Sequence, residues 1–416
     1  MIFNSSNIFS KSPEAKSNKI KVLIATGIFP PDIGGPATIL GALARDLCQA
    51  DFSVKIITYA DQAKKDREKK ESRVLGMGFE IHRIIRGRGT ASHLKYFWRM
   101  LKLSRRADLI YVTDTYSVGY FAYLIKKIFG KKYIVRFAGD SAWETAVANG
   151  WTNDYIVDFQ KNNYNDKIEA LKNKRTKILV NADKVIAVID FMNRIAKAIG
   201  VDGNKIKIIY NSVDFIKPES FNDEAIKNIK RRYGTDTKII VTACRLTPWK
   251  GVDGIIRIMP KLITRLGKIN FLVLGDGQEL NNLKELAGEL RVNSNVHFLG
   301  RIPQSQMINY LAAADLFVLN TNYEGLSHTI LEAMTASVPI LTTNVGGNPE
   351  IIDNNKNGVL VNFNDEQELE VAMIKILSDQ ELTDNLVKNA NAKLKKFNWS
   401  DELAETIKLL KEVYEK

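Results

Sequence analysis

The feature that most constrains the fold of this chain is an alternation of short β-rich runs with helical patterns, which occurs twice along its 416 residues. Strands separated by helices predict βαβ units and a mainly parallel sheet. A chain of this length also exceeds the size at which one hydrophobic core keeps growing. We therefore predict an α/β protein made of two doubly wound, Rossmann-like domains that face each other across a cleft.

The expected strands divide into two groups. Those of the first sheet are Lys21–Thr26, Val54–Tyr59, Glu80–Ile85, Leu109–Thr113, Tyr133–Phe137, Val185–Ile189 and Ile206–Tyr210. Those of the second are Ile239–Ala243, Asn270–Leu274, Val296–Leu299, Leu316–Asn320, Pro339–Thr342 and Gly358–Val361. The predicted domains are residues 20–214 and 237–397, with a linker at 215–236. Residues 1–19 are expected to form a mobile tail and 398–416 a final amphipathic helix.

Composition indicates an ordinary globular protein, with 45% hydrophobic and 26% charged residues. The two cysteines, Cys48 and Cys244, lie far apart in apolar contexts, which argues against a disulfide framework and favours a reducing compartment. The sequence has no apolar run of the roughly 18 residues that a membrane span requires. We therefore expect the protein in the cytoplasm.

The net charge of +13 is concentrated between Asp61 and Asp140, where 19 Lys and Arg residues stand against 8 Asp and Glu. Nucleic acid, anionic lipid and a solvated surface are all compatible with such a basic region. Within it, the segment Lys95–Arg106 is basic and amphipathic. This segment could dock the protein, as a peripheral protein, on an anionic membrane, or it could be a core-packed helix with a solvated basic face.

Ligands of open parallel sheets bind beyond the carboxyl ends of the strands, so chemistry is sought in the loops that follow them. The first such loop runs from Gly27 to Pro36. Its Gly34 and Gly35 could let backbone amides approach an anion at a helix N-terminus, or they could form an ordinary turn.

The loop after the first strand of the second domain carries two cations, Arg245 and Lys250, with Gly251 expected to start the next helix. Arginine offers a two-pronged fork to phosphate and lysine a point charge. Together they suit a diphosphate whose negative charge grows as it departs. The alternative is a pair of solvated surface cations.

The most informative segment runs from Glu324 to Glu332 and is expected to open a helix at Ser327, a favourable N-cap. Eight residues at about 1.5 Å each separate the two glutamates by up to ~12 Å. That is too far for a hydrolase pair, whose carboxyls lie roughly 5 to 9.5 Å apart. The two carboxylates could instead hold two ends of one elongated ligand. His328 in the first turn could be a ligand or a packed histidine.

A further glycine turn, with Gly346 and Gly347, lies between Thr343 and Glu350 and leads into another helix. It repeats the expected geometry of a turn that cradles an anion.

The Glu-x7-Glu segment, the Arg-Leu-x-x-x-Lys-Gly run and the Gly-Gly-Asn-Pro-Glu turn together resemble glycosyltransferase family 4 on the GT-B fold. The resemblance implies that Arg245 and Lys250 bind the donor diphosphate, Glu332 the ribose hydroxyls and Glu324 the transferred sugar. It implies donor contacts for these further residues: Gly34, Gly35, Gly300, Arg301, Gly325, Leu326, Ser327, His328, Gly346 and Gly347. It also implies that the last helix crosses back onto the first domain.

The chain departs from the family pattern at two places. Many relatives carry a His-Asp pair after the strand that corresponds to Tyr133–Phe137, whereas this chain has Asp140 in the sequence Arg-Phe-Ala-Gly-Asp. Asp140 is our candidate for contacting the sugar or the acceptor. At the hinge the family often reads Asn-Gly-Val-Asp, and this chain has Asn211-Ser-Val-Asp214, to which we assign no catalytic role.

The resemblance implies a retaining hexosyltransferase that uses a UDP- or GDP-linked sugar and a glycan or lipid-linked acceptor. Because the chain has no Asp-x-Asp sequence, we expect neither a bound metal nor another cofactor. One alternative is a sugar-nucleotide epimerase of the same fold. Another is a basic nucleic-acid-binding protein, although the chain has no recognised nucleic-acid-binding motif, so nucleic acid is not an expected partner.

Overall fold

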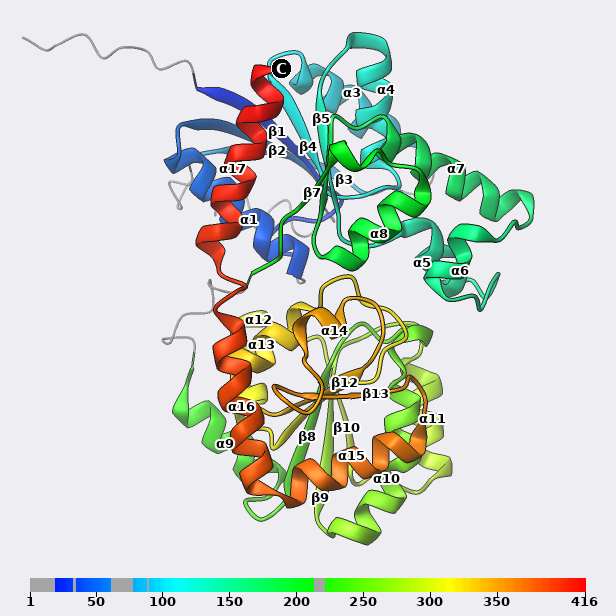
Figure 1. Ribbon diagram of the computed structural model, residues 1–416, viewed down its shortest axis with the longest axis vertical. Coiled ribbons are helices and arrows are strands. Elements are labelled where there is room, and N and C mark those ends of the chain that lie inside the picture. The colour runs from blue at the N-terminus through cyan, green and yellow to red at the C-terminus, as the bar shows by residue number, and fades with distance from the viewer. Residues whose placement is uncertain (1–18, 33–34, 61–77, 88–89, 213–220) are drawn as a thin grey trace, which may run out of the picture.

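The structure is a computed structural model that describes residues 19–32, 35–60, 78–87, 90–212 and 221–416. The predicted tail, residues 1–18 of it, lies outside the described residues. The chain forms two α/β domains, one above the other in Figure 1, each built on one parallel sheet. The predicted fold class, two Rossmann-like domains, is confirmed.

The N-terminal domain has a seven-stranded parallel sheet in the order β3-β2-β1-β4-β5-β6-β7. Its strands are β1 (Ile20–Ala25), β2 (Phe52–Ala60), β3 (Glu80–Ile85), β4 (Leu109–Val112), β5 (Tyr133–Phe137), β6 (Lys184–Ala187) and β7 (Ile206–Ile208). Its helices are α1 (Gly35–Gln49), α3 (Ala91–Ser104), α4 (Val118–Phe129), α5 (Ser141–Ala148), α6 (Ile156–Lys161), α7 (Asp166–Val180) and α8 (Asp190–Ile199).

The C-terminal domain has a six-stranded parallel sheet in the order β10-β9-β8-β11-β12-β13. Its strands are β8 (Lys238–Ala243), β9 (Ile269–Leu274), β10 (Val296–Gly300), β11 (Leu316–Leu319), β12 (Ile340–Thr343) and β13 (Val359–Val361). Its helices are α9 (Asp223–Tyr233), α10 (Val252–Leu266), α11 (Leu280–Glu289), α12 (Gln304–Ala313), α13 (His328–Thr335), α14 (Asn348–Ile351), α15 (Glu366–Ser378) and α16 (Gln380–Leu394).

The order of strands reverses between β1 and β4 in the first sheet and between β8 and β11 in the second. Central strands such as β4 and β11 read as continuous apolar runs because both faces of each sheet are covered. Ligands of such sheets bind at the reversal point, beyond the carboxyl ends of the strands. In the second domain this point is flanked by the loops after β8 and β11, and the predicted charged residues Arg245, Lys250 and Glu324 lie in these loops.

Aromatic side chains from the two domains meet at an interdomain seam, which we define as the contact of Ala138–Trp143 with Trp249 and Tyr323–Gly325. The ring of Trp143 lies 4.8 Å from that of Tyr323 and 5.7 Å from that of Trp249, between ring centroids. The hydroxyl of Tyr323 accepts a hydrogen bond from the backbone N–H of Asp140 at 3.3 Å. The domains are thus joined by a continuous apolar cluster as well as by the chain itself.

The predicted linker at 215–236 is in part a helix of the C-terminal domain. Helix α9 occupies Asp223–Tyr233 and contacts α12, with Ile229 and Tyr233 buried. The apolar residues of this segment follow a helical spacing, but many charged residues separate them, and for this reason the sequence was interpreted as an irregular linker. Residues 213–220, which include the predicted hinge position Asp214, lie outside the described residues.

The last helix, α17 (Trp399–Glu415), lies against the N-terminal domain beside α1 (Figure 1). Leu409, Leu410 and Val413 join the apolar cluster on one face of the first sheet. At the other end of the helix, Glu402 forms a buried ion pair of 2.5 Å with Arg136 of β5. No helix in the described ranges has both the length and the apolar composition that a bilayer span needs.

We expect Glu402→Ala to destabilise the protein by about 3–5 kcal/mol, because it leaves the buried guanidinium of Arg136 without its counter-charge. Glu405→Ala on the same helix is the matched control. It removes a partly exposed ion pair with Lys207 and should cost at most about 1 kcal/mol. Urea unfolding followed by tryptophan fluorescence measures both. Equal losses would show that the buried pair does not anchor α17.

Candidate active site

The candidate site lies where the loops after β8 and β11 approach each other. The loop after β8 forms a 3₁₀ turn at Pro248–Lys250, and the next residue, Gly251, has φ +52°. A Cβ at Gly251 would collide with the backbone oxygen of Asn320, the residue that follows β11. A side chain at Gly251 would therefore force the two loops apart.

This approach places Lys250 and Glu324 in a direct ion pair. Their side chains are only 13% and 16% exposed, so the attraction is screened less than that of a surface pair. Both residues were predicted for the site from the sequence, but the spacing along the chain did not predict that they pair. The ion pair ties the two loops together at the seam.

A charged side chain that the sequence analysis did not select, Glu144, faces this pair from the N-terminal domain. It lies on α5, which contacts the 3₁₀ turn. Burial raises the pKa of Glu144 to about 7, and the opposite charges of Arg245 and Lys250 limit the rise. Arg245 is exposed at the end of β8. The site therefore combines two cations and Glu324 of one domain with a carboxylate of the other.

Asp140 is used differently from the ligand contact that we expected. The residue is fully buried, and one carboxylate oxygen caps α5 by accepting hydrogen bonds from backbone N–H groups of the first turn. The other oxygen accepts a hydrogen bond of 3.0 Å from Gln160 and forms an ion pair with Arg175. Because both oxygens are engaged by the protein, the geometry favours Glu144 for the role. A ligand contact by Asp140 stays a prediction.

Glu332 lies on α13 and is 3% exposed. Burial raises its pKa to about 7, and a hydrogen bond of 2.7 Å from the amide of Gln304 limits the rise. The oxygen of the Gln304 amide accepts a hydrogen bond from Thr38 of α1, so Gln304 links Glu332 to the N-terminal domain. The second carboxylate oxygen of Glu332 has no hydrogen-bond partner within the described part of the chain. No sequence signal pointed to Gln304.

His328 is the first residue of α13 and lies one turn before Glu332. Its Nε2 lies 2.8 Å from the side-chain amide nitrogen of Asn211, at the end of the N-terminal domain. Burial, and then the charge of Arg136, lower the pKa of His328 to about 4. The imidazole is therefore neutral at physiological pH.

The segment before α13 holds the remaining predicted donor contacts of this loop. Ser327 is the N-cap of α13, as predicted, and its hydroxyl accepts a hydrogen bond of 3.4 Å from the N–H of Ile330. Leu326 is buried. The backbone of Gly325 lies directly against the carbonyl oxygen of Ala138 in the other domain. These three residues therefore position the loop at the seam, and their contacts to a donor stay predictions.

The glycine turn after β12 does not form the open anion cradle that we expected. The N–H of Gly346 donates to the hydroxyl of Tyr155 at 3.0 Å, and the N–H of Gly347 donates to the carbonyl of Glu324 at 3.0 Å. Both amides are committed to protein acceptors because the turn packs tightly on the loop after β11. The glycines here serve close packing between loops.

The other predicted donor contacts lie at loop ends. Gly34 lies outside the described residues, and Gly35 is the first residue of α1. Gly300 ends β10, and the carbonyl of Gly300 accepts a hydrogen bond of 2.8 Å from the N–H of Gly275. Arg301 is exposed and lies 3.4 Å from the carboxylate of Asp276. Their contacts with a nucleotide stay predictions.

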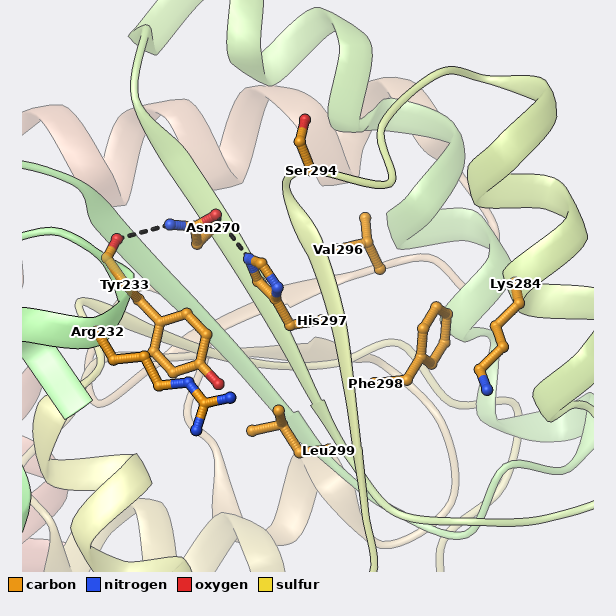
Figure 2. A pocket seen from close by; sticks show the side chains of 9 residues that line it. All are labelled: Arg232, Tyr233, Asn270, Lys284, Ser294, Val296, His297, Phe298 and Leu299. Atoms are coloured by element: carbon orange, nitrogen blue, oxygen red, sulfur yellow. Dashed lines mark hydrogen bonds between the residues drawn. The ribbon is translucent and has the colours of Figure 1, made fainter.

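A surface hollow of about 630 Å³ lies elsewhere, beside the edge strand β10 (Figure 2). None of the predicted site residues lines it. Two of its polar side chains bond each other: His297 lies 2.9 Å from Asn270, which donates to the carbonyl of Tyr233 at 2.7 Å.

Metal ligands do not cluster in the described ranges: no three His, Cys, Asp or Glu side chains come together in a way that could hold an ion. The charged groups of the candidate site, at or beside the seam, are two basic side chains, Arg245 and Lys250, and two carboxylates, Glu144 and Glu324.

Sequence models of two known families match consecutive parts of the chain. The model described as Glycosyltransferase Family 4 matches residues 33–216, and the model described as Glycosyl transferases group 1 matches residues 223–393. The chain belongs to glycosyltransferase family 4. The resemblance seen in the sequence is confirmed, and the protein is a glycosyltransferase.

Two relatives place this glycosyltransferase among curated proteins. It is 26% identical over 405 residues to an uncharacterized glycosyltransferase of Methanocaldococcus jannaschii, an alignment that covers 94% of this chain and 98% of the other. It is 33% identical to a GDP-mannose-dependent monoacylated alpha-(1-6)-phosphatidylinositol monomannoside mannosyltransferase of Corynebacterium glutamicum. That second alignment spans only 39% of this chain and 44% of the mannosyltransferase.

Solved structures of glycosyltransferases share the fold. Anabaena HepE in complex with UDP-glucose matches with a TM-score of 0.75 at 18% identity, over 94% of this chain and 99% of that one. WaaG, a glycosyltransferase involved in lipopolysaccharide biosynthesis, matches with a TM-score of 0.69 at 17% identity, over 93% and 98%. The family 4 glycosyltransferase described here therefore has the GT-B fold.

The raised pKa of Glu332 predicts how the stability of the ligand-free enzyme depends on pH. A carboxyl whose pKa is about 7 when folded and 4.5 when unfolded favours the folded state below pH 4.5, and this contribution is lost as the pH rises through 7. Glu332→Gln mimics the protonated form. We expect it to stabilise the protein at pH 8 but to have little effect at pH 5, as measured by thermal unfolding.

Glu412→Gln is the matched control for this measurement. The hydrogen bonds from Lys416 and Lys184 lower the pKa of Glu412 to about 2, so it stays charged from pH 5 to pH 8. Its substitution should have the same effect at both pH values. If the effect of Glu332→Gln is also the same at pH 5 and pH 8, the raised pKa of Glu332 is contradicted.

Proposed function

We propose that this glycosyltransferase is a retaining enzyme that transfers a hexose from a UDP- or GDP-linked donor to a glycan or lipid-linked acceptor. The observation that carries the proposal is the shielded Lys250–Glu324 ion pair, with Arg245 beside it, at the point where the strand order of the second sheet reverses. Fixed positive groups at this point suit a diphosphate, and an adjacent carboxylate suits the hydroxyls of a sugar.

Relatives support the choice of donor. A solved structure of HepE contains UDP-glucose, and the curated mannosyltransferase of C. glutamicum is named as GDP-mannose-dependent. Both donors are nucleotide-diphosphate hexoses, although their bases differ.

In the proposed mechanism the bond between the sugar C1 and the diphosphate oxygen breaks, while the acceptor oxygen bonds to C1 on the same face. The leaving phosphate oxygen takes the proton of the acceptor hydroxyl. Negative charge grows on the diphosphate as the bond breaks, and Arg245 and Lys250 stabilise that charge. Catalysis then depends more on these two cations than on a protein base.

The ion pair gives Glu324 two tasks in this mechanism. It holds the ammonium group of Lys250 in place, so that the cation need not reorganise when charge develops on the diphosphate. Its other oxygen can accept a hydrogen bond from a sugar hydroxyl. Glu144 closes the site from the N-terminal domain, where the acceptor would enter.

Glu332 is proposed to bind the ribose. Its Oε1 is held by Gln304, while Oε2 is buried without a partner in the described residues. A buried oxygen in this state gains a full hydrogen bond when a hydroxyl donates to it. Because Gln304 also bonds Thr38, the carboxylate is oriented by both domains.

We further propose that the reaction needs no metal ion, because Arg245 and Lys250 are two cations that can neutralise the diphosphate in place of a metal. The donor itself is then the only small molecule that the enzyme requires besides its acceptor, and no further cofactor takes part.

The acceptor is proposed to be lipid-linked and to be reached at the cytoplasmic face of a membrane, with α3 as the docking element. One face of α3 packs on the core through Tyr96 and Met100. The opposite face exposes Leu94 (58%) and Trp98 (64%) together with basic residues, among them Lys102. Exposed tryptophan beside cations is typical of a helix that lies in a membrane interface.

We expect Arg245→Ala and Lys250→Ala each to lower kcat by about 10²- to 10³-fold with a smaller change in KM, because each removes charge stabilisation from the transition state. Purified protein is incubated with UDP- and GDP-linked hexoses, with and without a lipid extract, and product is followed by mass spectrometry. Addition of EDTA should leave the rate unchanged.

Arg301→Ala is the matched control, since Arg301 is an exposed arginine at another strand end of the same domain. It should change KM more than kcat. Unchanged turnover in both Arg245→Ala and Lys250→Ala would refute the mechanism. Conversion of the donor without any acceptor product would favour the epimerase alternative.

Sedimentation with vesicles of phosphatidylcholine and phosphatidylserine tests the docking helix. We expect binding that weakens as salt rises, because a polybasic face gains roughly 1 kcal/mol per cation near an anionic surface. Lys102→Glu, which reverses one of these charges, and Trp98→Ala, which removes the exposed ring, should each lower binding at least about tenfold. Lys388→Glu, an exposed charge reversal in the C-terminal domain, should bind normally. Binding that ignores salt, or that Lys388→Glu weakens equally, would contradict docking through α3.

A further inference from the structure

Helix α13 presents two buried polar atoms without partners in the described residues, Nδ1 of His328 and Oε2 of Glu332. The two residues are four positions apart, so their side chains lie on the same face, one helical turn from each other. Buried polar groups are nearly always hydrogen-bonded, so two unpartnered atoms on one helix face are available to bind a ligand. When Glu332 is ionised, its Oε2 can accept a hydrogen bond but cannot donate one, whereas the role of Nδ1 of His328 depends on the tautomer of the ring.

The tautomer of His328 is set by a chain of hydrogen bonds that begins on another element. Arg136 is bonded to Glu402 and to the side-chain oxygen of Asn211. A guanidinium has only donors, so the oxygen of the Asn211 amide must face Arg136. The NH₂ group of Asn211 then points at Nε2 of His328, 2.8 Å away. Nε2 must accept this bond and therefore carries no hydrogen.

A neutral imidazole with a bare Nε2 carries its hydrogen on Nδ1. Burial and the charge of Arg136 keep the ring neutral by lowering its pKa to about 4. The orphaned atom of His328 is thus an N–H donor, and the orphaned atom of Glu332 is an acceptor in the ionised form of the carboxyl. Their ligand must offer an acceptor at one end and a hydroxyl donor one helical turn away.

We propose that Nδ1–H of His328 donates a hydrogen bond to a phosphate oxygen of the nucleotide donor, and that Asn211 is the positioning residue that fixes the required tautomer. The inference rests on the proposed function, in which Glu332 takes the ribose hydroxyls. Phosphate adjoins ribose in a nucleotide, and His328 lies at the N-terminus of α13, where the helix favours an anion. The hinge segment therefore helps to bind the donor without touching it.

Two substitutions of His328 separate this role from simple packing. In His328→Asn the side-chain amide places an N–H group close to the position of Nδ1. In His328→Gln the amide extends to the position of Nε2, beside Asn211, and leaves no donor toward the ligand. We expect His328→Gln to weaken the binding of UDP or GDP by about 10- to 100-fold, the range for a hydrogen bond to a charged group, and His328→Asn to keep most of the affinity.

Calorimetry with UDP and GDP, and with uridine and guanosine as phosphate-free probes, measures these effects. The affinity for the nucleosides should be the same in both variants. An equal loss for nucleoside and nucleotide would place the contact on the base or ribose. A loss seen only with a nucleotide sugar, and not with the nucleoside diphosphate, would place it on the hexose. Either result overturns the proposal.

The ring nitrogens of His328 report the tautomer directly in ¹⁵N NMR spectra of the ligand-free protein. We expect the hydrogen on Nδ1 in the wild type and a mixture of tautomers in Asn211→Ala, whose nucleotide affinity should fall toward that of His328→Gln. An unchanged tautomer in Asn211→Ala, or a wild-type ring with hydrogen on Nε2, would refute the positioning role. This readout needs no ligand, so it stands even if neither UDP nor GDP binds, which would refute the proposed function instead.

Discussion

The buried guanidinium of Arg136 is the point on which the arrangement of this protein depends. It bonds Tyr111 within the first sheet, Glu402 on the last helix and Asn211 at the end of the N-terminal domain. A buried charge is tolerated only when its donors are satisfied, so these three segments must stay together. Through Asn211 the same network reaches the imidazole of His328 in the other domain. One cation thus links the first sheet, the last helix and, through Asn211, the candidate site.

Charge at the interdomain seam follows from the close packing of loops. Lys250 and Glu324 pair because the loops after β8 and β11 lie close together, at a separation that is possible only because Gly251 has no side chain. Glu144 reaches the same place from α5, and burial gives it a pKa of about 7. Carboxylates in such surroundings change their protonation near neutral pH, which is common at catalytic sites. The site is assembled from both domains, so each domain alone holds only part of it.

The sequence predicted the two sheets well because the pattern of apolar and polar residues along a strand depends directly on which of its faces are buried. It was less specific where a residue type has two uses. Asp140 was selected as an acidic residue after a strand, yet it precedes a helix and caps it, a signal that the N-cap preference of aspartate could have given. Gly346 and Gly347 were selected as an anion cradle, yet their N–H groups are taken by Tyr155 and by a backbone carbonyl. Only the packing of neighbouring loops distinguishes these uses.

The sequence by itself determined the family, the two-domain parallel α/β architecture and the main charged residues of the candidate site, because these depend on local patterns and on motifs of fixed spacing. The tertiary structure decided which of those residues meet. It paired Lys250 with Glu324, added Glu144 and Gln304 and fixed the tautomer of His328 through residues more than a hundred positions away. Such contacts join segments that are distant in the chain, so local patterns do not predict them. The direction of each hydrogen bond in the network depends on the positions of all its donors and acceptors, which only the folded structure gives.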